Sequence, residues 1–152
     1  MANLCMIDMH VKGRKENIVK FEKALTQKGD VWIGRGADGD FDYHDDDNTA
    51  VFTGSCKWSA YTALIKDAIY MRTKPDEWNF EPRNEEDITF ITLIEASAIY
   101  NLDVEIYSEE EIFQEHLLIK KGIVEASEEV DFHTEEDTEK VTGGFGKWEF
   151  EF

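Results

Sequence analysis

The chain has 152 residues, a length that fits one folded domain able to bury a hydrophobic core of its own. Hydrophobic residues make up 41% of it and aromatic residues 12%, which excludes a largely disordered protein. The net charge of −18, from 34 acidic and 16 basic residues, predicts repulsion from nucleic acid and from anionic membranes, and attraction to basic proteins.

Cysteine content and hydropathy indicate the cellular compartment of the protein. Cys5 and Cys56 are too few for a disulfide framework and form no CxxC pair, so a reduced cytoplasmic protein is expected. The first residues lack the basic and apolar regions of a signal peptide, and no apolar run reaches the roughly 20 residues of a membrane helix. We therefore expect a single cytoplasmic domain over residues 1–152.

A strand and a helix are predicted first. Residues 4–12 alternate as a strand does, which places Ile7, Met9 and Val11 on the expected core face and Met6, Asp8 and His10 on the other. Residues 15–28 have the apolar spacing of a helix, with Ile18, Phe21 and Leu25 on one side and Gly29 as its stop.

The next segment is predicted as a hairpin followed by a helix. Residues 31–35 and 49–58 read as strands on either side of an acidic loop, 38–48, and Gly54 suggests a bulge or a close approach of two backbones. Ser59 is expected to cap a helix that runs through Met71.

The second half is predicted to contain one helix and several strands. Its expected elements are a loop over 74–83, a capping segment over 84–87, a helix over 88–100, strands over 103–108, 113–120 and 123–132 with a turn at 121–122, a charged stretch over 134–142 and a closing strand within 143–152. This order predicts an α+β fold: a mostly antiparallel sheet with two or three helices, and a ferredoxin-like core with extra strands.

The sequence offers no convincing catalytic motif. Read as an EF-hand, the stretch from Asp38 to Asp47 lacks glycine and glutamate at the required positions, and no histidine pair has zincin spacing. Glu115 and His116 are neighbours in a predicted strand, so their side chains point to opposite faces. We predict neither an enzyme nor a bound cofactor or metal, and interpret Cys5 and Cys56 as buried, inert thiols.

The acids are unevenly distributed along the chain. Between Glu105 and Glu139 they far outnumber Lys120 and Lys121, and six aspartates lie between positions 38 and 48. Carboxylates at several-ångström spacing can imitate part of the field of a nucleic-acid duplex, which carries one charge per about 1.7 Å of axis. The alternative is that these acids are simply dispersed over a soluble domain.

Three segments, residues 1–13, 52–59 and 105–110 followed by 113–116, resemble the Api-like ferredoxin-domain proteins of phages and mobile elements. The sequence departs from that pattern at Leu4, where tryptophan is common, and in the acidic stretch at 38–48. The resemblance implies a ferredoxin-like core, brings no catalytic residues, and suggests an accessory role in a phage.

We therefore expect a phage-type inhibitor of a host defence complex, of the anti-CRISPR kind, acting in the host cytoplasm as a monomer or homodimer without binding nucleic acid directly. It would bind a basic, nucleic-acid-binding protein surface, such as that of a CRISPR effector, through acidic loops. The expected contact residues are Asp38, Asp40, Asp42, Asp45, Asp46, Asp47, Glu109, Glu110 and Glu111.

Two alternatives stay open at this point. A binder of a small molecule or signalling nucleotide would use a pocket with Arg35, Lys57 and Trp58. A hydrolase using Glu115 and His116 is the weaker of the two.

Overall fold

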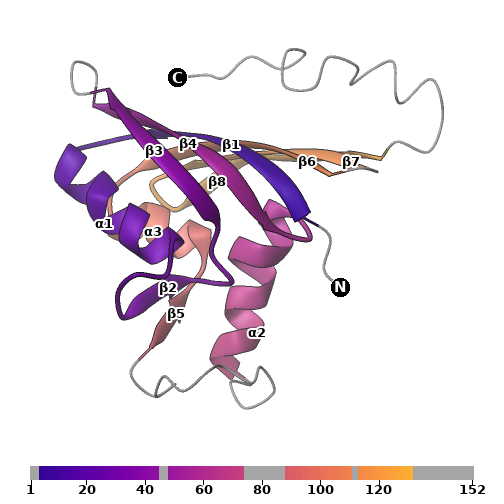
Figure 1. Ribbon diagram of the computed structural model, residues 1–152, viewed down its shortest axis with the longest axis horizontal. Coiled ribbons are helices and arrows are strands. Elements are labelled where there is room, and N and C mark those ends of the chain that lie inside the picture. Colours follow the sequence, from indigo (N-terminus) through magenta and orange to yellow (C-terminus); the bar gives the residue numbers. More distant parts are fainter. Residues whose placement is uncertain (1–3, 45–47, 74–87, 111–112, 132–152) are drawn as a thin grey trace.

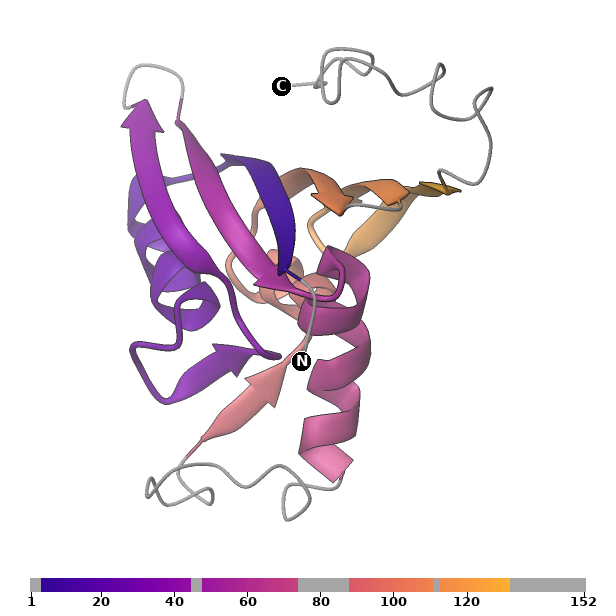
Figure 2. The ribbon, with the colours of Figure 1, turned by 45° about the vertical axis from the view of Figure 1, so that its right-hand side comes forward.

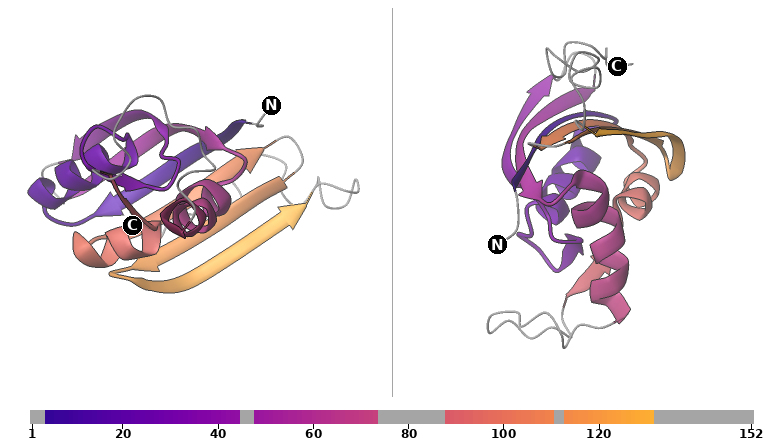
Figure 3. Two further views of the ribbon diagram at one scale, coloured as in Figure 1. Left: turned by 90° about the horizontal axis from the view of Figure 1, so that it is seen from below. Right: turned by 90° about the vertical axis from the view of Figure 1, so that its right-hand side faces the viewer.

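The computed structural model describes residues 4–44, 48–73, 88–110 and 113–131. A six-stranded antiparallel sheet has the strand order β3-β4-β1-β6-β7-β8. The helices lie on one face of this sheet, which curves around them (Figures 1 and 3). The strands are β1 (Leu4–Lys12), β3 (Asp38–His44), β4 (Thr49–Lys57), β6 (Asp103–Glu110), β7 (Phe113–Lys120) and β8 (Ile123–Asp131).

The core of the sheet has ferredoxin-like topology. Strand β1 pairs antiparallel with β4 on one side and with β6 on the other. The chain leaves β1 through helix α1 (Lys15–Leu25) and returns in β3, parallel to β1 with β4 between them. A second crossover leads from β4 to β6 around β1, so two split β-α-β units interlock. The predicted α+β fold with extra strands, here β7 and β8, is confirmed.

Alternation along β1 separates the two faces of the sheet as predicted. Ile7, Met9 and Val11 are buried against the helices, whereas Met6 is exposed on the opposite side. We call the face that packs on the helices the inner face and the opposite one the outer face.

Side-chain caps mark the start of the helix that follows β4 and of α3. The Ser59 hydroxyl accepts a hydrogen bond from the Thr62 amide at 3.0 Å, which confirms the predicted cap of the helix that follows β4. That helix continues through a π-helical turn, η1 (Thr62–Lys66), into α2 (Asp67–Thr73). No helix in the described ranges combines the length and apolar character needed to cross a membrane.

The predicted helix over 88–100 is wrong at its start. Residues Thr89–Ile91 form strand β5, and helix α3 covers only Leu93–Ile99. Thr92 and Glu95 form a capping box, each side chain bonded to the other's backbone N–H at 3.0 Å, and this fixes the first turn. Glu95 also pairs with Arg72 of α2 at 2.8 Å, which ties α3 to its neighbour and lowers the pKa of the Glu95 carboxyl.

The predicted hairpin is also placed wrongly. The acidic stretch is not all loop, because Asp38–His44 forms strand β3, and it is β3 that makes the hairpin with β4. Strand β2 (Val31–Ile33) instead pairs in parallel with β5, forming a separate two-stranded sheet near α2 (Figure 2). A second small core forms there, from Trp32, Met71, Ile88 and Phe90.

The turn at Lys121–Gly122 is confirmed; both residues have positive φ angles, of 48° and 88°. Such angles suit a two-residue hairpin turn. The expected loop over 74–83, the capping segment over 84–87, and the predictions for 134–142 and 143–152 fall outside the described residues.

Strand β3 is held at the edge of the sheet by aromatic contacts and by glycine pairing. The Phe41 ring packs on Phe52 and Phe21, with ring centroids 5.0 Å and 6.3 Å apart. Gly39 lies directly opposite Gly54 on β4, and a Cβ atom at Gly54 would overlap the backbone carbonyl of Asp38. The predicted close approach at Gly54 is therefore confirmed, and a side chain there would push the edge strand away.

Substituting Gly54 by alanine should lower the free energy of unfolding by about 1–3 kcal/mol, because the added methyl group meets backbone that cannot move without breaking the β3–β4 ladder. Urea unfolding followed by circular dichroism measures it. Gly29→Ala is the matched control, since a Cβ there meets nothing within 4 Å, and its effect should stay within about 0.5 kcal/mol. Equal effects of the two substitutions would contradict this account of β3.

Candidate functional site: the outer face of the sheet

The outer face carries rows of side chains that cross several strands. One row runs Asp38, Ser55, Met6, Glu109 across β3, β4, β1 and β6. Because neighbouring strands lie about 4.8 Å apart, Asp38 and Glu109 are separated by about 14 Å. The next row places Asp40 and Asp8 on either side of Thr53, about 10 Å apart by the same spacing.

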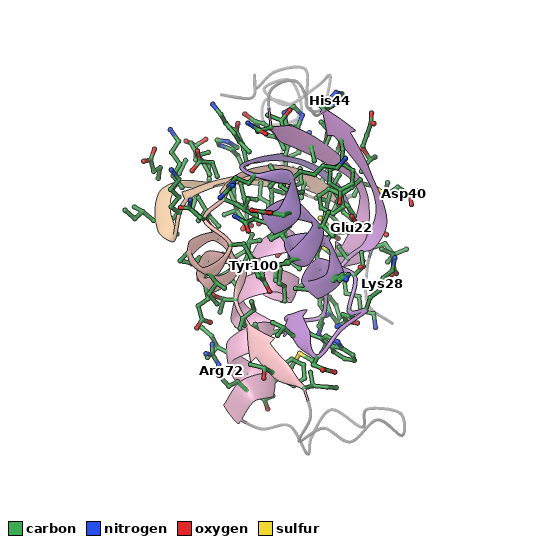
Figure 4. The ribbon with its side chains drawn as sticks, turned by 90° about the vertical axis from the view of Figure 1, so that its left-hand side faces the viewer. Glu22, Lys28, Asp40, His44, Arg72 and Tyr100 are labelled. Atoms are coloured by element: carbon green, nitrogen blue, oxygen red, sulfur yellow. The ribbon has the colours of Figure 1, made fainter. Side chains whose placement is uncertain are left out.

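Three of the predicted contact residues lie together on strand β3. Asp38, Asp40 and Asp42 alternate with the aromatic residues that face the core, so all three carboxylates leave the strand on its outer side, and all three are exposed. Their spacing along the strand is about 7 Å. Figure 4 shows Asp40 on the side of β3 turned away from Glu22 of helix α1.

The other predicted contact residues do not all join this surface. Glu109 reaches the outer face and is half-buried, whereas Glu110, one residue later, is on the inner face and buried. Residues 45–47 and Glu111 lie outside the described residues. Within the described chain, the surface we call the acidic face consists of Asp8, Asp38, Asp40, Asp42 and Glu109.

Asp8 is the member of the acidic face that the sequence reasoning did not select. It lies at the centre of the sheet, and burial raises the pKa of its carboxyl while His10 opposes that rise. The signal for it was available in the alternation of β1, which already placed Asp8 with Met6 and His10 on the non-core side. It was missed because it lies in no acidic run.

An exposed apolar group borders the acidic face where β1 begins and β4 ends. Leu4 and Met6 project from β1, Trp58 lies in the connection from β4 to the helix, and Tyr61 lies in the first turn of that helix; all four are exposed. Trp58 has a φ angle of 70°, a strained conformation for a bulky residue, and its side chain is 42% exposed. Tryptophan and tyrosine are the residue types that most often anchor protein interfaces.

Over β6 and β7 the outer face is occupied by contacts among its own side chains. The rings of Tyr107 and His116 stack with centroids 4.4 Å apart. Nε2 of His116 lies 2.7 Å from the carboxylate of Glu105, which is completely buried, and Nδ1 lies 3.9 Å from that of Glu128. The Glu105 charge is thus engaged inside the protein and adds little to the exposed acidic face.

Glu115 and His116 point to opposite faces, as the sequence predicted. The Glu115 carboxylate is buried on the inner face, where it accepts hydrogen bonds from the Ala60 amide at 2.5 Å and the Ser108 hydroxyl at 2.6 Å. It therefore caps the helix that follows β4. The pair named in the hydrolase alternative does not share a site.

A small recess tests the small-molecule alternative. Arg35 and Lys57 line it, but Trp58 is not among its lining residues, and Arg35 is bonded to Asp67 at 2.6 Å. Its volume of about 70 Å³ is small beside the roughly 300–1,000 Å³ of pockets that hold drug-sized ligands. The recess is too small to enclose a nucleotide.

Among the described residues, no three His, Cys, Asp or Glu side chains are grouped so that they could hold a metal ion. Comparisons of the chain with protein-family models, with curated proteins and with solved structures found no match. What the acidic face and its apolar border bind is therefore inferred from their residues alone.

Replacing Glu115 by alanine should lower the free energy of unfolding by about 2 kcal/mol or more, because buried donors, among them the Ala60 amide, lose their acceptor. Glu115→Gln keeps an acceptor oxygen and should cost less. Chemical unfolding of the two variants measures the difference. Equal losses of unfolding free energy would contradict the role of the Glu115 oxygen as a helix cap.

A comparison of the wild type with Glu115→Gln gives a prediction for the pH dependence of stability. Burial is the main cause that raises the pKa of Glu115, so the folded state binds this proton more tightly than the unfolded state does. The wild type should therefore gain stability relative to Glu115→Gln as the pH falls from neutral through the folded-state pKa. Thermal unfolding across that range checks the sign, and a constant difference would contradict it.

Proposed function

We propose that this protein is a non-enzymatic inhibitor that binds the basic, nucleic-acid-binding surface of a cytoplasmic protein complex through its acidic face. A host defence complex of the CRISPR type is the proposed target. The observation that carries the proposal is the alignment of Asp38, Asp40 and Asp42 on the outer side of one edge strand, in register with Asp8 and Glu109.

The spacing of the charges favours a cationic partner. Carboxylates about 7–14 Å apart across the sheet fall within or just beyond the screening length of about 8–10 Å at ordinary salt, so their fields overlap only in part. A partner that meets several of them at once gains in association rate and in specificity. A protein groove that normally holds a phosphate backbone presents such a set of cations.

The exposed apolar residues at the border of the acidic face supply binding free energy that the charges alone do not. Exposed charge pairs are worth little in binding free energy, whereas a buried aromatic anchor contributes more. Trp58 and Tyr61 follow β4 in the chain. They come after the end of β4 that lies near the row from Asp38 to Glu109. The proposed interface is therefore acidic over β3 and at Asp8 of β1, and aromatic at one end.

A competition assay tests the proposal. Increasing amounts of the protein should displace a labelled DNA duplex from a purified CRISPR effector, and added salt should weaken the displacement. The double variant Asp40→Lys, Asp42→Lys should compete about tenfold or more weakly, because it places cations where the partner is cationic.

The matched control is Glu16→Lys, Asp30→Lys, which changes the net charge equally at two exposed sites outside the sheet. It should compete almost as well as the wild type. Equal competition by the wild type and the Asp40, Asp42 variant contradicts the proposed site, and no displacement by the folded wild type contradicts the inhibitory role.

A further inference from the structure

The two cysteines of the chain face each other on adjacent strands, near the end of the sheet where β1 begins and β4 ends. Cys5 on β1 is directly opposite Cys56 on β4 in the antiparallel register, and both side chains point to the inner face. Both thiols are free. Fifty-one positions separate them in sequence, so the register of β1 and β4 is what brings them together.

Directly opposed positions have the separation that a disulfide requires. Opposed residues of an antiparallel pair have Cα atoms about 4.5 or 5.5 Å apart, depending on the hydrogen-bonding pattern. Disulfides span Cα distances of about 4.4–6.8 Å. The bond can therefore form without displacing either strand.

The two sulfurs already interact. A hydrogen bond from the Cys56 thiol lowers the pKa of Cys5, while the same contact and burial raise the pKa of Cys56. Loss of one proton thus gives a thiolate that the other thiol stabilises. A thiolate is the species that attacks a disulfide.

A small recess in the described part of the chain reaches one of the two cysteines. Cys5 is completely buried, whereas Cys56 is among the residues that line the recess next to Lys57. A volume of about 70 Å³ admits a few water molecules or the sulfur end of a small molecule. A small disulfide can enter, and it meets Cys56 first.

We propose that Cys5 and Cys56 form a reversible cross-strand disulfide, made by exchange with a low-molecular-weight disulfide that enters through the recess. Cys56 attacks one sulfur of the reagent while its proton passes to the Cys5 thiolate that it hydrogen-bonds, and the first small thiol leaves. Cys5 then attacks the Cys56 sulfur and releases the second. Two protein thiols and one disulfide become one protein disulfide and two small thiols, so hydrogen atoms and electrons balance.

The bond would tie β1, which carries Asp8, Leu4 and Met6, to β4, which pairs with the aspartate-bearing strand β3. It closes a long loop that includes α1, β2 and β3, and cross-links that close long loops constrain the unfolded chain strongly. Oxidation should therefore stabilise the fold while leaving the outer face in place.

The test uses the full-length protein in its native fold, with 2-hydroxyethyl disulfide as the oxidant. The expected product is a monomer that has lost two hydrogen atoms, has no thiol left to alkylate, and yields a linked Cys5–Cys56 peptide on digestion. Its unfolding midpoint should rise, and dithiothreitol should return it to the starting value.

Two single variants test the order of attack. In Cys5→Ser, Cys56 should keep one mercaptoethanol group as a mixed disulfide; in Cys56→Ser, the buried Cys5 should stay unmodified until the protein unfolds. The proposal is overturned if both wild-type thiols stay free under native conditions, or if oxidation links only separate chains. Faster alkylation of Cys5 than of Cys56 in the wild type would overturn the proposed entry side without relying on either variant.

Discussion

The pairing of β1 with both β4 and β6 is the interaction on which the rest of the structure depends. One crossover of the ferredoxin-like core starts from this strand and the other passes over it, and its inward residues Cys5, Ile7, Met9 and Val11 are all buried. Alternation then requires its other side chains to leave the sheet on the opposite face. Because the described helices all cover the inner face, the outer side of the same strand becomes surface, with Asp8 at its centre.

The structure separates the acids of the chain into two groups with different physical roles. Glu105 and Glu115 are buried and satisfied by neighbours, His116 for one and the start of a helix for the other, so they belong to the fold. Asp38, Asp40 and Asp42 are exposed and parallel on an edge strand, where charge also discourages pairing with another chain. The exposed group offers its charge to a partner, whereas the buried group does not.

Sequence reasoning predicted the elements whose pattern is local. The alternation of β1, the turn at Lys121–Gly122 and the cap at Ser59 each depend on a few adjacent residues. It failed at β3, where the aspartates were read as a loop although Phe41 and Tyr43 alternate with them as in a strand. It failed at β5 because a short apolar run suits a strand or a helix equally, and its partner β2 is far away in sequence.

The candidate site was predictable only in part for the same reason. Consecutive acids such as Glu109 and Glu110 attract notice in a sequence, but in a strand they face opposite ways, and only Glu109 reaches the acidic face. Asp8 joins that face through strand order, and the cysteine pair depends on register, which no local pattern specifies.

The most direct measurement is a backbone amide NMR titration with protamine, an arginine-rich DNA-binding protein. The account predicts salt-sensitive shift changes confined to β3, β4 and β1, to β6 near Glu109, and to the connection around Trp58. Changes concentrated on α1, α2 and α3 instead, or no saturable change at low salt, would contradict it.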